Sequence, residues 1–106
     1  MNQYAFPLDP SWSTEEIVKV VNFLDTVDNV YLKGVPLSKV YDDYQAYQAV
    51  VDSIGAQKRL DREFQRASGY SIYQVVKAME AIIGRGSGAR QALSQHQKAC
   101  LKLQVK

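Results

Sequence analysis

A helix start at residues 12–17 is the sequence feature that most constrains the fold of this 106-residue chain. Ser13 can cap the helix, because its hydroxyl can accept a hydrogen bond from the backbone N–H of Glu16. The Glu16 carboxylate can in turn accept one from the Ser13 N–H, which completes a capping box. Trp12 and Ile17 flank this cap at the spacing of a hydrophobic staple. The pattern predicts a helix whose first turn follows Ser13.

The helix that follows has a wide apolar face. At about 100° per residue, apolar side chains cover about half of its circumference. They are Ile17, Val20, Val21, Phe23, Leu24, Val27, Val30 and Tyr31. Because so wide a face needs partners on two sides, we expect this helix to be central. Asp28 could face a basic partner such as Arg59 or Arg62, but we expect it at the rim of the face. Gly34 is placed to end the helix in a left-handed conformation, and Pro36 follows.

Three further helices are predicted, over residues 37–51, 56–67 and 72–83. Ser71 and Gln74 repeat the capping-box pattern at the last of them, with Tyr70 and Val75 as a second staple pair. Gly69 and Gly84 stand where helices commonly end. No segment shows convincing strand periodicity, so we expect no strand.

The predicted fold class is all-α, a small bundle or array of four helices. We expect an extended N-terminal arm before Ser13, since Pro7 and Pro10 disfavour helix there. The predicted divisions are a helical domain with its arm at residues 1–83, a glycine-rich linker at 84–90 and a basic C-terminal segment at 91–106. This segment should be loosely attached and, with Leu93 and Leu101 as apolar positions, form a weak fifth helix.

Charge and cysteine content limit the cellular compartments in which the protein is expected. Residues 1–80 carry a net charge of −3, whereas residues 81–106 carry +5 and no acidic residue. The single cysteine, Cys100, excludes an internal disulfide framework and fits a reducing compartment. The sequence shows neither a signal-peptide pattern nor an apolar run long enough to cross a membrane. We expect a cytoplasmic protein with no membrane partner.

Two stretches carry a resemblance to a known family. They are Tyr4-x-Phe6-Pro7-Leu8-Asp9-x-x-Trp12-Ser13-Thr14-Glu15-Glu16 and Ser68-Gly69-Tyr70-Ser71-x-Tyr73-x-Val75-Val76-Lys77. The chain resembles the YktA-like family of short uncharacterised bacterial proteins over about residues 4–80. This resemblance implies a cytosolic all-helical protein and no particular activity. The glycine-rich linker and basic tail lie outside the resemblance.

No catalytic, cofactor-binding or metal-binding residues are predicted. His96 and Cys100 could share one helix face, but two ligands are too few for a zinc site, which needs three or four from the protein. A reactive cysteine–histidine pair would lack an orienting third group. Gly84, Gly86 and Gly88 lack the lysine of a phosphate-binding loop and follow a helix instead of a strand. We therefore expect the protein not to be an enzyme.

Tyrosines are the best candidates for an interaction surface. Tyr41, Tyr44 and Tyr47 share the second predicted helix, and Tyr73 lies at the start of the fourth. Tyrosine combines apolar area with a polar tip and is common at interfaces. The alternative is that these rings line the core with their hydroxyls in water. We predict a protein-interaction module that binds an unidentified protein partner or itself.

Weak nucleic-acid binding is the alternative function. Candidate phosphate contacts are Arg85, Arg90, Lys98 and Lys102 in the basic tail. Residues 64–78 also resemble a helix-turn-helix corner. The side chains that would face a DNA groove there include little that can read base edges, and the tail cations are not interleaved with aromatic residues.

Overall fold

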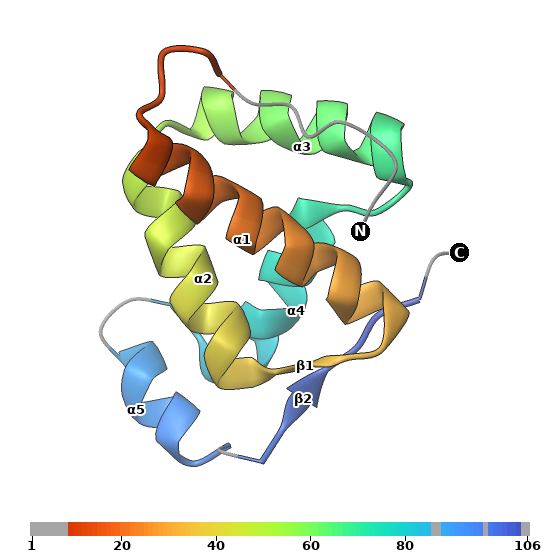
Figure 1. Cartoon of the computed structure of the whole chain (residues 1–106). Coiled ribbons are helices and arrows are strands. Elements are labelled where there is room, and N and C mark those ends of the chain that lie inside the picture. The colour runs from red at the N-terminus through yellow and green to blue at the C-terminus, as the bar shows by residue number, and fades with distance from the viewer. Residues whose placement is uncertain (1–8, 86–87, 97, 105–106) are drawn as a thin grey trace.

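The computed structural model describes residues 9–85, 88–96 and 98–104 (Figure 1). Its elements in chain order are α1 (Thr14–Leu32), β1 (Val35–Pro36), α2 (Leu37–Val50), α3 (Ile54–Ser68), α4 (Ile72–Ile83), α5 (Gly88–Ser94) and β2 (Cys100–Leu101). The predicted all-α fold class is confirmed. Most of the predicted N-terminal arm, at residues 1–8, lies outside the described residues, as do Gly86, Ser87 and Lys106.

Helix α1 begins as its sequence predicts. The Ser13 hydroxyl accepts from the Glu16 N–H at 3.2 Å, and the Ser13 N–H donates to the Glu16 carboxylate at 2.8 Å. This capping box satisfies two backbone groups that a bare helix end would leave unpaired. At the other end the helix stops at Leu32, and Gly34 has a φ of +89°, in the left-handed region that favours glycine.

The closely packed pair α1 and α2 forms the centre of the molecule, with α3 crossing at one end and α5 at the other (Figure 1). Phe23 of α1 is fully buried between α1 and α2, with its ring centroid 4.6 Å from that of Tyr47 and 5.6 Å from that of Tyr44. The expected rim position of Asp28 is wrong, since this side chain is only 1% exposed. Because α1 is covered on two sides, burial extends beyond its apolar arc.

The corner between α3 and α4 is fixed by groups from both helices. Gly69 ends α3 with a φ of +84°, and the Ser71 hydroxyl caps α4 by accepting from the Gln74 N–H at 3.2 Å. Asp61 of α3 adds a second cap, accepting from the Ile72 N–H at 2.8 Å and the Tyr73 N–H at 3.4 Å. The carboxylate therefore ties the start of α4 to the middle of α3.

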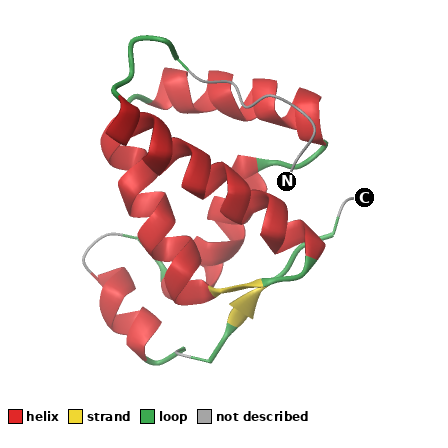
Figure 2. Ribbon diagram, in the orientation of Figure 1, coloured by secondary structure: helices red, strands yellow, loops and turns green. Residues whose placement is uncertain are grey.

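The C-terminal segment contains a strand, so the expectation of no strand is wrong (Figure 2). β2 pairs antiparallel with β1, with Val35 opposite Leu101 and Pro36 opposite Cys100. The Leu37 N–H also donates to the Ala99 carbonyl at 2.9 Å. A helix continuing to the end of the chain is wrong as well, because α5 ends at Ser94. Pairing with β1 gives the backbone of this extended segment hydrogen-bond partners that it lacks within itself.

Helix α5 begins at Gly88, inside the predicted linker, and its Ala89 and Leu93 are buried against the core. The division of the chain into domain, linker and tail stays a prediction. Among the described helices, none combines the length and apolar character that crossing a membrane requires.

Candidate functional site

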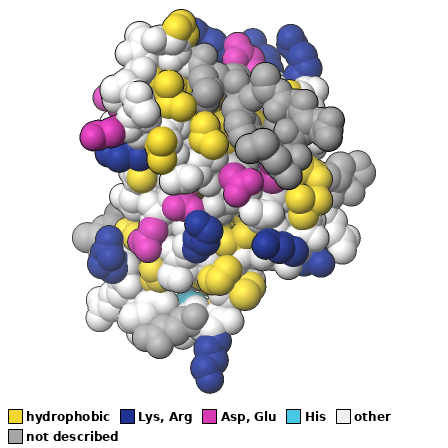
Figure 3. Space-filling model, in the orientation of Figure 1, with side chains coloured by type: hydrophobic (Ala, Val, Ile, Leu, Met, Phe, Trp, Pro, Cys, Tyr) yellow, Lys and Arg dark blue, Asp and Glu magenta, His cyan; other side chains and the backbone are white. Residues whose placement is uncertain are grey.

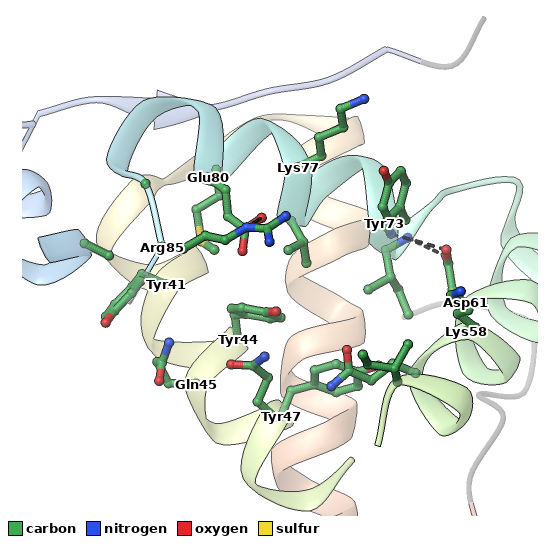
Figure 4. Close-up of a pocket in the computed structure, with 18 residues that line it drawn as sticks. Tyr41, Tyr44, Gln45, Tyr47, Lys58, Asp61, Tyr73, Lys77, Glu80 and Arg85 are labelled. Carbon is green, nitrogen blue, oxygen red and sulfur yellow. Dashed lines mark hydrogen bonds and ion pairs between the residues drawn. The ribbon is translucent and has the colours of Figure 1, made fainter. Parts of the chain in front are cut away.

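A groove of about 690 Å³ lies between α2 and α4. Lys58 and Asp61 of α3 line one end of it and Arg85 lines the other (Figure 4), and Gly84 and Ala89 also belong to the lining. Its volume falls within the range of about 300–1,000 Å³ that is usual for ligand pockets. This groove is the best candidate for a functional site in the described part of the chain.

The four tyrosines predicted as an interaction surface all line this groove. Tyr41, Tyr44 and Tyr47 follow one another at three-residue intervals along one face of α2, which helical geometry places in a row. Tyr73 reaches the groove from α4. The three α2 rings are buried, with exposures of 7%, 8% and 1%, whereas Tyr73 is 58% exposed. The α2 tyrosines thus belong to the core and to the groove wall, while Tyr73 is at the rim.

Tyr47 is the deepest of these residues. Its ring packs on Phe23, and its hydroxyl oxygen is buried without a hydrogen-bond partner among the described residues. Burial raises the pKa of the Tyr47 hydroxyl, and the nearby Asp61 and Tyr44 raise it further. The group therefore stays protonated at neutral pH. A buried hydroxyl without a partner costs about 1–3 kcal/mol, so it is an exception that needs an explanation.

The acidic side chains in the groove lining already have partners. Glu80 pairs with Arg85 at 2.9 Å, close to Tyr44 in Figure 4. Asp61 accepts from the backbone at the start of α4. Burial nevertheless raises the pKa of Asp61, because the loss of water outweighs these hydrogen bonds.

Two basic side chains in the lining have no ion-pair partner among the described residues. Neither Lys58 nor Lys77 has a carboxylate of the described residues within 4.0 Å, and the Lys77 ammonium lies 5.9 Å from the Tyr73 ring centroid. The groove therefore combines an aromatic α2 wall with two lysines that have no ion-pair partner among the described residues.

The candidate phosphate contacts do not all belong to this groove. Only Arg85 lines it. The guanidinium carbon of Arg90 lies 5.5 Å from the Tyr41 ring centroid, and Lys98 and Lys102 are exposed in the C-terminal segment. On the face drawn in Figure 3, Lys and Arg side chains are scattered over the molecule and not gathered in one patch. Their role as phosphate contacts stays a prediction.

His96 and Cys100 do not share a helix face, which corrects the premise of a possible pair. Helix α5 has ended before His96, and Cys100 lies in β2. Both residues are exposed. Within residues 9–85, 88–96 and 98–104, no three His, Cys, Asp or Glu side chains are grouped so that they could hold a metal ion.

Sequence reasoning missed Asp61, the residue that joins the groove to the α3–α4 corner. Its signal was weak, because a carboxylate eleven residues before Ile72 has no local reason to cap α4. The unpartnered state of the Tyr47 hydroxyl was also missed, since three tyrosines in a row give no indication of which one is deepest.

Comparisons with known proteins identify the relatives of this chain. A family model described as "Uncharacterised protein family (UPF0223)" matches residues 3–82. A UPF0223 protein of Streptococcus agalactiae is 48% identical over 79 residues, which cover 74% of this chain and 85% of the relative. One of Streptococcus equi subsp. zooepidemicus is 47% identical over 81 residues, covering 76% and 88%. One of Streptococcus thermophilus is 46% identical over 78 residues, covering 74% and 84%.

These matches confirm the expected membership of a family of short uncharacterised bacterial proteins. The family model includes the four tyrosines, Asp61 and both groove lysines. It ends before Arg85, so the four candidate phosphate contacts lie beyond it.

Proposed function

This chain belongs to the uncharacterised protein family UPF0223, and we propose that it is a non-catalytic cytosolic module that binds a segment of a partner polypeptide in the α2–α4 groove. The observation that carries the proposal is the convergence of Tyr41, Tyr44, Tyr47 and Tyr73 on one groove. Tyrosine supplies large contact area at low entropic cost, which suits polypeptide recognition. The exposed thiol of Cys100 fits a reducing cytosol.

The rim supports docking by an apolar group. Tyr73 and Ile54, at 58% and 71% exposure, are two of the large apolar side chains most open to water in the described chain, and both line the groove. Contact with a partner would remove this area from water, at a gain of about 25 cal/mol per Å². Apolar side chains around a concave site are a typical mark of an interaction surface.

Charge favours an acidic partner. Asp61 and Glu80 are engaged within the protein, whereas Lys58 and Lys77 have no described carboxylate at ion-pair distance. A segment carrying Asp or Glu beside an apolar residue would complement both the edge and the walls. Such rim charges act mainly on association rate and specificity.

The length of the groove fits a short stretch of chain. Its α4 wall runs from Ile72 to Glu80, which spans about 12 Å at 1.5 Å per residue. An extended polypeptide covers that distance with about four residues. The proposed occupant is therefore a short acidic and apolar segment of another protein.

Selection from a phage-displayed library of random peptides, each about 12 residues long, tests the proposal with the full chain as bait. We expect enrichment of peptides with acidic residues flanking a large apolar residue. A synthetic copy of the most enriched peptide should bind Gln45→Trp at least about tenfold more weakly, because this exposed residue lines the groove and the indole would fill it.

Ala49→Trp is the matched control, since Ala49 is exposed on the same helix and does not line the groove. Equal binding by both tryptophan variants would place the peptide elsewhere and overturn the proposal. A library that yields no peptide would also count against it. If sedimentation then showed a dimer that Gln45→Trp dissociates, the occupant would be a second copy of the chain.

Charge reversal tests the acidic character of the segment. Lys77→Glu should weaken binding of the selected peptide, and the loss should shrink as salt is added, because exposed charges are screened. Lys19→Glu makes the same change on an exposed position of α1 outside the groove and should leave affinity nearly unchanged. Equal effects of the two reversals would indicate attraction to overall charge instead of groove recognition.

Nucleic-acid binding has weaker support. Arg85 is paired with Glu80, and Asp61 places a carboxylate at the start of the helix that would enter a DNA groove. A negative charge there would face the phosphate backbone.

A further inference from the structure

The hydroxyl of Tyr47 is the buried polar group of the groove that the fold leaves unused. Tyr47 is 1% exposed, and its oxygen has no hydrogen-bond partner among the described residues, although the side chain lines the groove. Most buried polar groups in proteins are hydrogen-bonded, because leaving one unpaired costs about 1–3 kcal/mol. Packing alone does not explain the hydroxyl, since phenylalanine would fill the same space against Phe23.

We infer that the Tyr47 hydroxyl is a recognition group, which donates a hydrogen bond to a neutral oxygen acceptor on the polypeptide segment that enters the groove. This inference rests on the proposed function and names the chemistry that the floor of the groove selects. The acceptor is a main-chain carbonyl or the carboxamide of an Asn or Gln side chain.

Two features of the floor favour a neutral acceptor. The raised pKa of Tyr47 keeps its proton in place, so the group is a donor. Asp61 also lines the groove and raises that pKa through its charge, so a second carboxylate brought to the same place would be repelled. Desolvation makes a buried anion still less favourable. Acidic residues of the segment therefore belong at the rim near Lys58 and Lys77, and the floor takes an uncharged oxygen.

The inference predicts opposite effects of one substitution on stability and binding. Tyr47→Phe removes a buried group without a partner, so the free protein should melt roughly 4–8 °C higher. The same variant should bind the peptide selected by the wild-type chain about three- to tenfold more weakly, since one hydrogen bond is lost. A residue with only a structural role would not couple a gain in stability to a loss of affinity.

Tyr44→Phe is the matched control. Tyr44 lies one turn earlier on the same helix and lines the same groove, and its hydroxyl is not among the buried atoms without a partner. Its removal should change neither the melting temperature nor the affinity as strongly. Both variants are full-length chains, and circular dichroism reports their folding.

A second arm distinguishes the two sources of the acceptor. Each Asn or Gln of the selected peptide is replaced in turn by Leu, and binding to wild type and Tyr47→Phe is compared as a double-mutant cycle. Coupling at one position assigns a side-chain carboxamide, and coupling at none assigns a main-chain carbonyl.

The possible outcomes distinguish the inference about Tyr47 from the proposed function on which it rests. If the peptide binds in the groove but Tyr47→Phe binds as tightly as wild type, the inference is overturned and the proposed function stands. If Tyr47→Phe lowers the melting temperature, the hydroxyl has a partner in the free protein, which also overturns the inference. If no peptide binds in the groove, both are overturned.

Discussion

The two sides of helix α2 differ in how completely they are closed. Toward α1, the ring of Phe23 is fully buried against Tyr44 and Tyr47. Toward α4, the same tyrosines line a groove. There the Tyr47 hydroxyl has no hydrogen-bond partner, and Lys58 and Lys77 have no ion-pair partner, among the described residues. The closed side pairs its polar groups within the fold, whereas the open side leaves some polar groups without a partner among the described residues.

This difference shows that one run of residues can pack in the core and line a groove at the same time. The rings of Tyr44 and Tyr47 pack on Phe23 and so stabilise the α1–α2 pair, and their positions make one wall of the groove. Sequence reasoning posed core and interface as alternatives for these tyrosines. In the structure a single ring can contact both, so the burial of a tyrosine does not exclude its contact with a ligand.

The largest effect is expected on the closed side. Phe23→Ala should lower the free energy of unfolding by about 3–5 kcal/mol, because it leaves a cavity between α1 and α2. Urea unfolding followed by circular dichroism measures the loss. Val18→Ala, at a half-exposed position of the same helix, should change it by no more than about 0.5 kcal/mol. A similar loss in both variants would show that the α1–α2 interface is not the main core.

The caps of the two helices should give smaller, unequal losses. Ser13→Ala removes the cap of α1 and should cost about 1 kcal/mol. Ser71→Ala should cost less, because Asp61 still accepts from the first N–H groups of α4. Urea unfolding of the two variants side by side measures the difference. A larger loss for Ser71→Ala would mean that the Asp61 carboxylate does not stabilise the start of α4, on the open side of α2.

A smaller, pH-dependent effect is expected from Asp61. Burial raises the pKa of its carboxyl in the folded chain above the ordinary value of 3.8. At a pH between these two pKa values, the folded chain therefore binds more protons than the unfolded chain. Stability from this group is therefore present at low pH and is lost as the pH rises through the folded pKa. The free energy of unfolding of wild type, relative to Asp61→Asn, should fall as the pH rises through this interval.

Urea unfolding between about pH 3 and pH 7 measures the trend, with Asp42→Asn on exposed α2 surface as the control for loss of a negative charge. A difference between wild type and Asp61→Asn that rises with pH would contradict the assigned cause of the shift.

The smallest effect on stability is expected at the rim. Tyr73→Ala should change the free energy of unfolding by no more than about 0.5 kcal/mol, because the side chain is 58% exposed. It should still weaken binding of the selected peptide by roughly tenfold, as loss of an aromatic contact does at an interface. Isothermal calorimetry gives the affinity. Unchanged affinity would remove Tyr73 from the binding surface.

The parts of the fold that were predicted from sequence depend on neighbours in the chain. Ser13 and Glu16 are three residues apart, and Gly69 follows its helix directly, so short-range rules identify both. The tyrosines of α2 were likewise recognisable from their helical spacing. Whether they face a partner helix or an open groove depends on how α2 and α4 cross, which no local pattern specifies.

The parts that were missed depend on contacts between distant residues. The Asp61 cap joins two helices, and the burial of Asp28 follows from the covering of α1 on two sides. The strand at Cys100–Leu101 exists because Val35–Pro36 lies beside it. Two residues are too few to show strand periodicity, so the sequence there favoured an extension of the helix.

The pairing of β1 with β2 also sets an order of events during synthesis. Val35 and Leu101 are 66 residues apart in the chain, so at roughly 5–20 residues per second the ribosome adds the partner of Val35 about 3–13 s later. During that interval the helices α1 and α2 can associate while the backbone of β1 has an open edge. Unpaired edges attract other strands, so the edge of β1 is exposed to mispairing until Cys100 and Leu101 arrive.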